Sequence, residues 1–389
     1  MIHEKTLGSE HGRLADVLNG LATLYFQQER TNEAETLFKR ALAIKEKASG
    51  LRNLESGTIL GNPGELYRLE GRFKEAEPLL ARALDAVEGI WGSEDIRVAT
   101  PLNNLAGVYA DLGRLREAIA FTARVVVITE KVLGPEHPDL ANSLSNLGEL
   151  YRRERRFSEA EPLLRRALAI SEKVFGPAHP AVATMLNNLA ELQQDEGHYL
   201  EAEDLLTRTA SIYEKALGAD DPRVGLTFNN LAALHFAQGH WNLAESFWQK
   251  STDIIIRRSK NSRVVRTARS NGGPSEPGRL GFEFRNLVKA SYRSAQGNSA
   301  EINKTSARLF VTAQWSLGSE AAESLAKMAA RGARGTRGFL PWFGSSKISP
   351  RLGGGGMTRA PLLSRWRRVS ATLRPKLPTW IVWRQSTRT

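Results

Sequence analysis

The chain has 389 residues, 41% of them hydrophobic, so it can bury apolar surface but is long for one compact core. It contains no cysteine, which excludes disulfides, thiolate zinc sites and a cysteine nucleophile. The net charge of +12 hides an asymmetry: residues 254–389 hold 26 Lys+Arg against 5 Asp+Glu, whereas residues 1–253 hold 28 against 37.

The N-terminal segment is polar and mixed in charge, unlike the apolar core of a secretory signal. No later stretch approaches the 18 consecutive apolar residues of a membrane-spanning helix. These features predict a soluble, cytoplasmic protein without a transmembrane segment.

Residues 1–256 are dominated by a pattern that returns every 42 residues. It reads LNGLATLY at 18–25, LNNLAGVY at 102–109, LNNLAELQ at 186–193 and FNNLAALH at 228–235. A small residue recurs with the same spacing of 42 residues, at Ala34, Ala76, Ala118, Ala160, Ala202 and Ala244. A period of this length is typical of a solenoid, here of about six repeats after a partial N-terminal one.

Within one repeat, the apolar residues of 144–151 have the three-and-four spacing of an amphipathic helix. The turn RRERRF interrupts the pattern, and 160–170 resumes it. Each repeat is therefore predicted to be a helical hairpin that must stack on its neighbours to bury both apolar faces. Pro63 stands where other repeats have leucine, and it predicts a late-starting or kinked helix there.

Loops such as LGPEHPDLA (133–141) and FGPAHPAVA (175–183) join successive repeats. His137 and His179 in these loops have no partner at ligand spacing, which favours surface positions over metal coordination. The sequence predicts no metal site, no cofactor and no catalytic residue.

The combined pattern LNNLAxxY…G…EAExLLxRALAIxEKxLGPxHPxVA resembles the 42-residue tetratricopeptide repeats of kinesin light chain and many bacterial proteins. The resemblance implies an all-α, right-handed superhelical solenoid whose first helices line a concave groove. It also implies binding of a protein or extended peptide without catalysis.

An asparagine recurs one turn before the aromatic position of the first helix in five of the repeats. Its amide can bond the main chain of a peptide of any sequence, and in similar repeats this position faces the ligand. The alternative is that these amides bond loop carbonyls of the adjacent repeat. The predicted groove residues are Asn62, Asn104, Asn146, Asn188 and Asn230, with Asn142, Glu149, Thr184 and Glu191 beside them as sources of specificity.

The period stops after residue 256. Residues 257–280 have the composition of a linker, and 281–335 recover helical periodicity around Phe284–Ala295 and Ala300–Met328. This helical connector resembles the one that follows repeats in bacterial proteins ending in a CHAT domain, a caspase-like protease fold. The protease itself is excluded, because the chain lacks cysteine and has no histidine after His240.

Residues 336–389 are basic, contain no acidic residue, and are predicted to be disordered. Cationic residues interleaved with tryptophan could bind nucleic acid or an anionic membrane surface. The abrupt change in composition favours another interpretation, out-of-frame translation of a GC-rich gene. Nucleic-acid binding is not expected outside this basic tail.

The sequence thus predicts a protein-interaction scaffold and not an enzyme. The alternative function is nucleic-acid or membrane-surface binding through residues 257–389. Self-association through exposed ends of the array is a further expectation, because an atypical terminal repeat exposes stacking surface.

Overall fold

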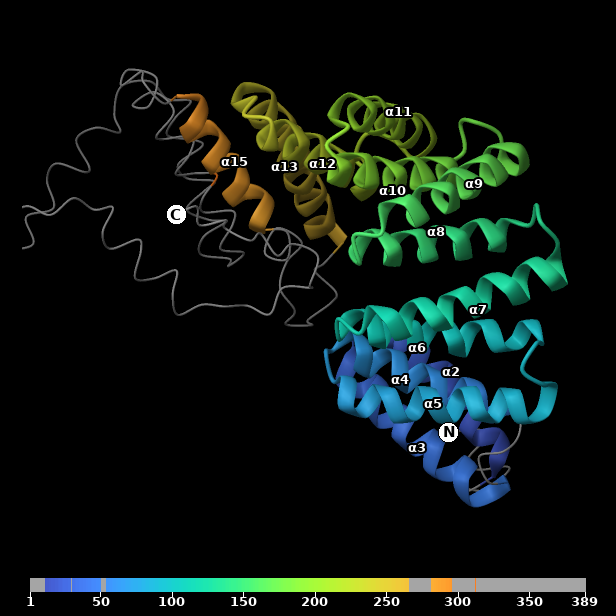
Figure 1. Cartoon of the computed structure of the whole chain (residues 1–389). Helices are drawn as coiled ribbons and strands as arrows, with labels where there is room; N and C mark the ends of the chain where they lie inside the picture. The colour runs from blue at the N-terminus through green and yellow to red at the C-terminus, as the bar shows by residue number, and fades with distance from the viewer. Residues whose placement is uncertain (1–10, 29, 50–53, 266–280, 296–311, 313–389) are drawn as a thin grey trace, which may run out of the picture. The chain divides into compact units, whose positions relative to one another are not determined.

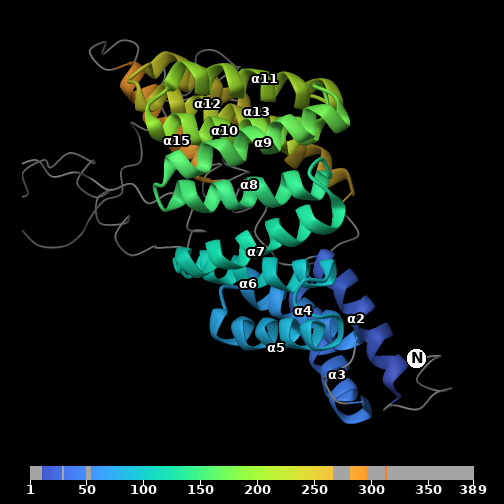
Figure 2. The same cartoon turned by 45° about the vertical axis from the view of Figure 1, so that its right-hand side comes forward.

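The computed structural model describes residues 11–28, 30–49, 54–265, 281–295 and 312. Within these ranges the secondary structure is helical, with no strand, and it consists of six consecutive helix pairs followed by one further helix. Figure 1 and Figure 2 show the helices following one another along the array. The prediction of an all-α solenoid of helical hairpins is confirmed.

We number the pairs as repeats 1 to 6. Repeats 1 to 3 are α2 (Gly12–Gln27) with α3 (Thr31–Ser49), α4 (Leu54–Leu69) with α5 (Phe73–Trp91), and α6 (Ala99–Asp111) with α7 (Leu115–Leu133), the short 3-10 helix η1 (Ile96–Val98) preceding α6. Repeats 4 to 6 are α8 (Pro138–Arg153) with α9 (Phe157–Phe175), α10 (Pro180–Glu196) with α11 (Tyr199–Leu217), and α12 (Pro222–Ala237) with α13 (Trp241–Val265). The last described helix is α15 (Gly281–Ser294).

The two helices of each repeat pack closely because a small residue lies between them. The recurring alanine of the second helix is fully buried in all six repeats. In repeat 4, a Cβ added at Gly148 of α8 would lie 3.3 Å from the carbonyl oxygen of Ala160 on α9. Backbones that approach this closely leave no room for a larger side chain, which explains why the sequence keeps alanine at this step.

In repeats 2 to 6, the turn inside the hairpin contains a residue with positive φ. Glycine supplies it in four repeats, at Gly71, Gly113, Gly197 and Gly239. Repeat 4 has Arg155 at the equivalent position, with φ of 61°. A side chain in this region is strained, because Cβ approaches the neighbouring carbonyl oxygen.

Several first helices begin with a side-chain cap. His137 and His179 accept a hydrogen bond through Nδ1 from the main-chain N–H two residues ahead, each at 3.1 Å, and Asp221 does so at 2.9 Å. A proline follows each of them at the first helical position, where its missing N–H costs nothing. The loop histidines are thus helix caps.

The sequence predicts a late-starting or kinked helix at Pro63; the late start is wrong, and the kink stays a prediction. Helix α4 begins at Leu54, at the same step of the period as Pro138 in α8. Pro63 removes one main-chain donor, but the helix buries Ile59, Leu60 and Leu66 completely. Burial of this flank outweighs the lost hydrogen bond.

Ion pairs connect the second helices of neighbouring repeats at a constant sequence separation. They join Arg82 to Glu46 at 2.9 Å, Arg166 to Glu130 at 2.5 Å, and Arg208 to Glu172 at 2.6 Å. Their side chains are exposed or partly exposed, so each contributes little stability alone.

The two ends of the described array differ. On α2, Val17, Leu21 and Leu24 are 45%, 37% and 53% exposed. At the other end α15 covers α13, and Phe284 and Leu287 of α15 are buried.

Polar contacts also join α15 to α13. Ser251 donates to Glu283, which is itself buried, and Ser291 donates to Glu245 at 2.9 Å. Helix α15 lies where the sequence predicts the first helix of the connector, whereas the second, Ala300–Met328, lies outside the described residues except for Thr312. The predicted boundary between array and linker, at residue 256, falls inside α13, which continues to Val265. Residues 336–389 lie outside the described residues.

Candidate functional site: the asparagine ladder of the first helices

One asparagine from each of five first helices forms the candidate site, which we call the asparagine ladder. Its members occupy α4, α6, α8, α10 and α12 at the same step of the period. The side chain of Asn146 is exposed, and the other four are partly buried. The ladder comprises Asn62, Asn104, Asn146, Asn188 and Asn230.

Three ladder residues bond to the first helix of the preceding repeat. Asn188 donates through Nδ2 to Ser145 Oγ at 2.8 Å, and Asn230 donates to Asn187 Oδ1 at 2.9 Å. Asn62 makes the equivalent contact at 3.3 Å. Each acceptor lies one residue before the ladder position of its own repeat. The amides therefore do bond the adjacent repeat, but through helix side chains and not through the loop carbonyls considered above.

Asn104 and Asn146 make no hydrogen bond with the described residues. For Asn104 the reason is clear: the residue at the acceptor position is Gly61, which has no side chain, and Asn104 Nδ2 lies 3.9 Å from where its Cβ would be. Asn103 occupies the acceptor position for Asn146, and nothing in the structure explains the missing bond there. Both amides keep their full hydrogen-bonding capacity.

The tethered asparagines also keep unused capacity. A carboxamide has two N–H donors and a carbonyl oxygen with two lone pairs. Asn188 and Asn230 each make one contact to the preceding repeat, whereas Asn62 Nδ2 lies 3.3 Å from both Asn19 Oδ1 and Thr23 Oγ1. The carbonyl oxygen and the second N–H of Asn188 have no partner among the described residues, while the bond to Ser145 fixes the orientation of the side chain. A donor and an acceptor held in a fixed orientation match the N–H and C=O of an extended main chain.

Glu149 and Glu191, predicted beside the ladder, are engaged in an ion-pair network around Arg152. Arg152 pairs with Glu149 at 2.7 Å, with Glu191 at 3.0 Å, and with Asp195. Asn187, which accepts from the ladder residue of repeat 6, donates to Glu191 at 3.0 Å. Burial raises the pKa of Glu191, and Arg152 opposes this effect. The network links repeats 4, 5 and 6.

A similar network connects repeats 2 and 3. Arg68 pairs with Glu65 at 2.6 Å and with Asp111 at 2.5 Å. A Cβ at Gly107 would lie 3.3 Å from Arg68 Cδ, so the glycine makes room for the arginine to cross between helices. These charges therefore pair with one another within the array and are not a free specificity surface.

The other two predicted neighbours of the ladder are exposed. Asn142 lies on α8, one turn before its ladder residue. Thr184 on α10 shares a hydrogen bond with the hydroxyl of Tyr213 at 2.9 Å. The structure thus places all nine predicted residues on first helices, and it draws Glu149 and Glu191 together through Arg152.

The acceptors Ser145 and Asn187 were not identified from the sequence, although a signal was present. A second polar residue precedes the ladder asparagine in the strings LNNLA, LSNLG and FNNLA. A doubled polar position on an otherwise apolar helix indicates a side-chain pair between repeats.

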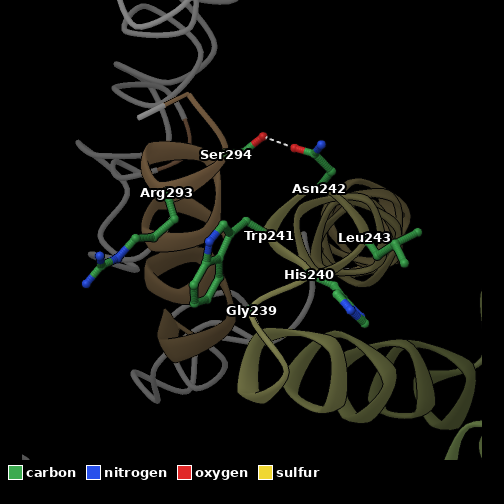
Figure 3. A pocket seen from close by; sticks show the side chains of 7 residues that line it. All are labelled: Gly239, His240, Trp241, Asn242, Leu243, Arg293 and Ser294. Carbon is green, nitrogen blue, oxygen red and sulfur yellow. Dashed lines mark hydrogen bonds between the residues drawn. The ribbon is translucent and has the colours of Figure 1, made fainter. Parts of the chain in front are cut away.

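A separate hollow lies where the turn between α12 and α13 meets α15. It is lined by Gly239, His240, Trp241, Asn242, Leu243, Arg293 and Ser294. Figure 3 shows the hydrogen bond between Ser294 and Asn242 at its edge. The hollow is open to solvent and includes no ladder residue.

The described ranges contain neither a cluster that could hold a metal ion nor a helix that could span a membrane. In the part of the chain that the structure describes, no three His, Asp or Glu side chains are placed to hold a metal ion. Among the described helices, none combines the length and apolar character needed to cross a membrane.

Comparison with known proteins identifies the repeat. The family described as tetratricopeptide repeat matches residues 2–47, 13–89, 55–121, 97–173, 144–215 and 181–257. No curated protein matches the sequence.

Solved structures have similar folds. Nearly identical repeats from a kinesin light chain of Podosopora anserina are 27% identical to this chain, covering 52% of it and 96% of their own length, with a TM-score of 0.48. The apo form of RapI is 13% identical and covers 82% of this chain and 99% of its own, with a TM-score of 0.52. A signal transduction ATPase of Pyrococcus horikoshii with a tetratricopeptide repeat sensor is 15% identical, covers 75% of this chain and 41% of its own, and has a TM-score of 0.52. The last two show a shared fold.

Proposed function

The chain belongs to the tetratricopeptide repeat family, and on that basis we propose that it is a protein-interaction scaffold that binds an extended segment of a partner protein along the asparagine ladder. The proposal includes no catalytic step and no cofactor. It places the protein in the cytoplasm, a location in keeping with a chain that has no cysteine.

The observation that supports this proposal is the hydrogen-bonding state of the ladder. Five carboxamides recur at one step of the period, and each keeps a carbonyl oxygen without a partner among the described residues. A core position would favour an apolar side chain, and a purely structural amide would be fully bonded. A row of oriented amides can bond a peptide main chain whatever its side chains are.

Specificity would then come from the side chains beside the ladder. Asn142 and Thr184 are exposed and can contact a ligand directly. Glu149 and Glu191 already neutralise Arg152, so they would contribute less attraction for a charged ligand than free carboxylates. We therefore expect a partner segment that is recognised mainly through its main chain.

The untethered asparagines allow a clean test. Replacing Asn104 and Asn146 by alanine removes two ladder amides without breaking a hydrogen bond between repeats. The full-length variant should lose most of the partner captured from a nuclease-treated lysate, while its thermal unfolding stays within about 0.5 kcal/mol of the parent. Asn32→Ala, an exposed asparagine on α3, is the matched control and should capture normally.

Salt dependence separates the two candidate functions. Capture through ladder amides should persist at moderate salt, whereas capture through phosphate neutralisation weakens steeply with salt. If the Asn104→Ala/Asn146→Ala variant captured as much partner as the parent chain, and if salt or nuclease abolished the capture, binding along the ladder would be rejected. That result would instead support the basic segment 257–389 as the binding region.

A further inference from the structure

The N-terminal face of repeat 1 exposes apolar side chains that every later repeat buries. Val17, Leu21 and Leu24 lie along one face of α2 and are 37–53% exposed. The residues at the Leu24 step of the later repeats are at most 7% exposed. They are Leu66, Val108, Leu150, Leu192 and Leu234.

In the later repeats this face is covered by helices of the preceding repeat. Leu66 of α4 shares a core cluster with Phe38 of α3, and Leu105 of α6 shares it with Leu80 of α5. The face is therefore built to pack against a helix, and a side chain left on it loses the burial of apolar surface that stabilises every other repeat.

This face is self-complementary when α2 meets a second α2 in the antiparallel direction. With the symmetry axis between Gly20 and Leu21, Val17 lies opposite the partner's Leu24, and Gly20 lies opposite the partner's Leu21. At the axis, the large side chain of Leu21 then packs against the partner's Gly20. A Cβ built at Gly20 would have no atom within 4 Å, so the space above the glycine is open. Surfaces of this kind form closed two-fold dimers.

The polar residues of the face agree with the same arrangement. In repeats 2 and 3, Tyr67 and Tyr109 donate to carboxylates of the preceding repeat, at 3.2 Å and 3.0 Å. Tyr25 occupies this position on α2, and the antiparallel arrangement sets it opposite the partner's Asp16, a carboxylate that pairs with Lys45 of its own subunit at 3.5 Å and is still 43% exposed. Arg13 falls opposite the partner's Gln28. No like charges meet, and the tyrosine gains the kind of acceptor that its counterparts have.

We propose that two copies of this chain pair through the N-terminal face, α2 packing antiparallel against α2 of the partner subunit. The inference is independent of what the asparagine ladder binds. One helix pair buries little area, so the dimer is in equilibrium with the monomer at micromolar concentrations.

The oligomeric state of the full-length chain tests the proposal first. Sedimentation velocity over a concentration series should show a monomer–dimer equilibrium. Leu21→Asp should weaken the dimer by at least about tenfold, because the charge would be buried at the axis. The control Leu200→Asp changes the most exposed leucine of the array, 81% exposed on α11, and should leave the equilibrium unchanged.

Disulfide trapping tests the arrangement itself, since the natural chain has no cysteine. A mixture of Val17→Cys and Leu24→Cys chains should form a cross-linked dimer on mild oxidation. Neither variant should cross-link alone. In the antiparallel arrangement, Val17 and the partner's Val17 are displaced by seven residues, about 10 Å along the helices, and the same holds for the two Leu24 positions. A disulfide cannot span this distance.

Three results would overturn the proposal. A monomer at all concentrations would mean that the face is covered by residues of the same chain or binds no copy. Species that grow beyond two would indicate head-to-tail association. A dimer that survives Leu21→Asp, or that gives no mixed disulfide, would use another surface.

Discussion

The stacking surfaces at the two ends of the described array are buried to different extents. At the N-terminal end, α2 exposes Val17, Leu21 and Leu24, whereas at the C-terminal end α13 is covered by α15. Helix α15 lacks the repeat motif, yet Leu287 and Ala290 share a core cluster with Ala244 and Trp248 of α13, where a further first helix would pack. The difference shows that an array can end on a helix unrelated to the repeat, provided that its apolar face fits.

The largest expected effect comes from removing that cover. Phe284→Ala should destabilise the chain by about 3–5 kcal/mol, because Phe284 is fully buried on α15, the helix that packs against α13. Hydrogen exchange should show the loss of protection in α13 and not in α2, since repeats interact mainly with their neighbours.

Tyr292→Ala provides the control on the same helix. Tyr292 is 54% exposed, so its replacement should change stability by less than about 0.5 kcal/mol. If the two substitutions had equal effects, α15 would not cover the array as described.

A matched pair of leucines tests the open end. Leu192→Ala should cost about 2–5 kcal/mol, because Leu192 is completely buried in repeat 5. Leu24→Ala, at the same step of the period, should cost less than about 1 kcal/mol when the chain is studied at a concentration where it is monomeric. Urea unfolding measures both. A large cost for Leu24→Ala in the monomer would show that residues outside the described ranges cover this face.

Repeat 6 differs from repeats 2 and 3 at the aromatic position of its first helix, and this difference should make its stability depend on pH. His235 replaces the tyrosine of repeats 2 and 3; its ring nitrogens are buried without a hydrogen bond, and Nε2 lies 3.6 Å from Glu203. Burial lowers the pKa of His235; Glu203 opposes the shift, and nearby His240 adds to it. The unfolded chain therefore binds a proton more readily than the folded chain, so stability is lost as the pH falls through the ordinary histidine range, near ~6.5.

His235→Tyr should remove this component of the pH dependence. A tyrosine hydroxyl can donate to Glu203 as Tyr67 donates to Glu35, and it does not titrate near neutral pH. Urea midpoints at pH 7.5 and 5.5 should differ less in the variant than in the parent chain. An unchanged difference would show that His235 is not the responsible group.

The smallest expected effect lies in the middle of the array. Arg155→Gly should stabilise the chain by about 1 kcal/mol, because glycine adopts the positive φ without strain and its greater freedom in the unfolded state offsets only part of this gain. The converse substitution, Gly197→Arg, should be destabilising. Thermal unfolding of both variants gives the comparison, and effects of the same sign would contradict the assignment of strain to this turn.

The period of the sequence predicted most of the fold, because each step has a local physical meaning. The alanine marks where the two helices of a repeat touch, and the three-and-four spacing of apolar residues marks the buried face of each helix. Six copies of the repeat give the same prediction. Of the late start or kink expected at Pro63, the late start is wrong, because tertiary burial overrides a single unfavourable residue in a helix. The repeat motif also ends before the helix does, so α13 extends to Val265 without a signal in the period.

The sequence predicted where the site residues lie, but not which side chains they bond. The ladder asparagines could be located from the period, but their bonds to Ser145 and Asn187 depend on the distance between helices of different repeats. Likewise, Glu149 and Glu191 look like free charges in the sequence, and only packing shows that Arg152 joins them. Contacts between repeats are set by geometry that no single repeat contains.

The constant separation of these contacts has a consequence for how the gene can change. Asn188 and Asn230 each reach back by the same number of residues, as do Arg166 and Arg208 in their ion pairs. Excising or duplicating one whole period would bring together surfaces built on the same spacing, although the acceptor varies between Asn19, Gly61, Ser145 and Asn187. We therefore expect chains with one repeat more or fewer to fold, so recombination between repeats can change the length of the array.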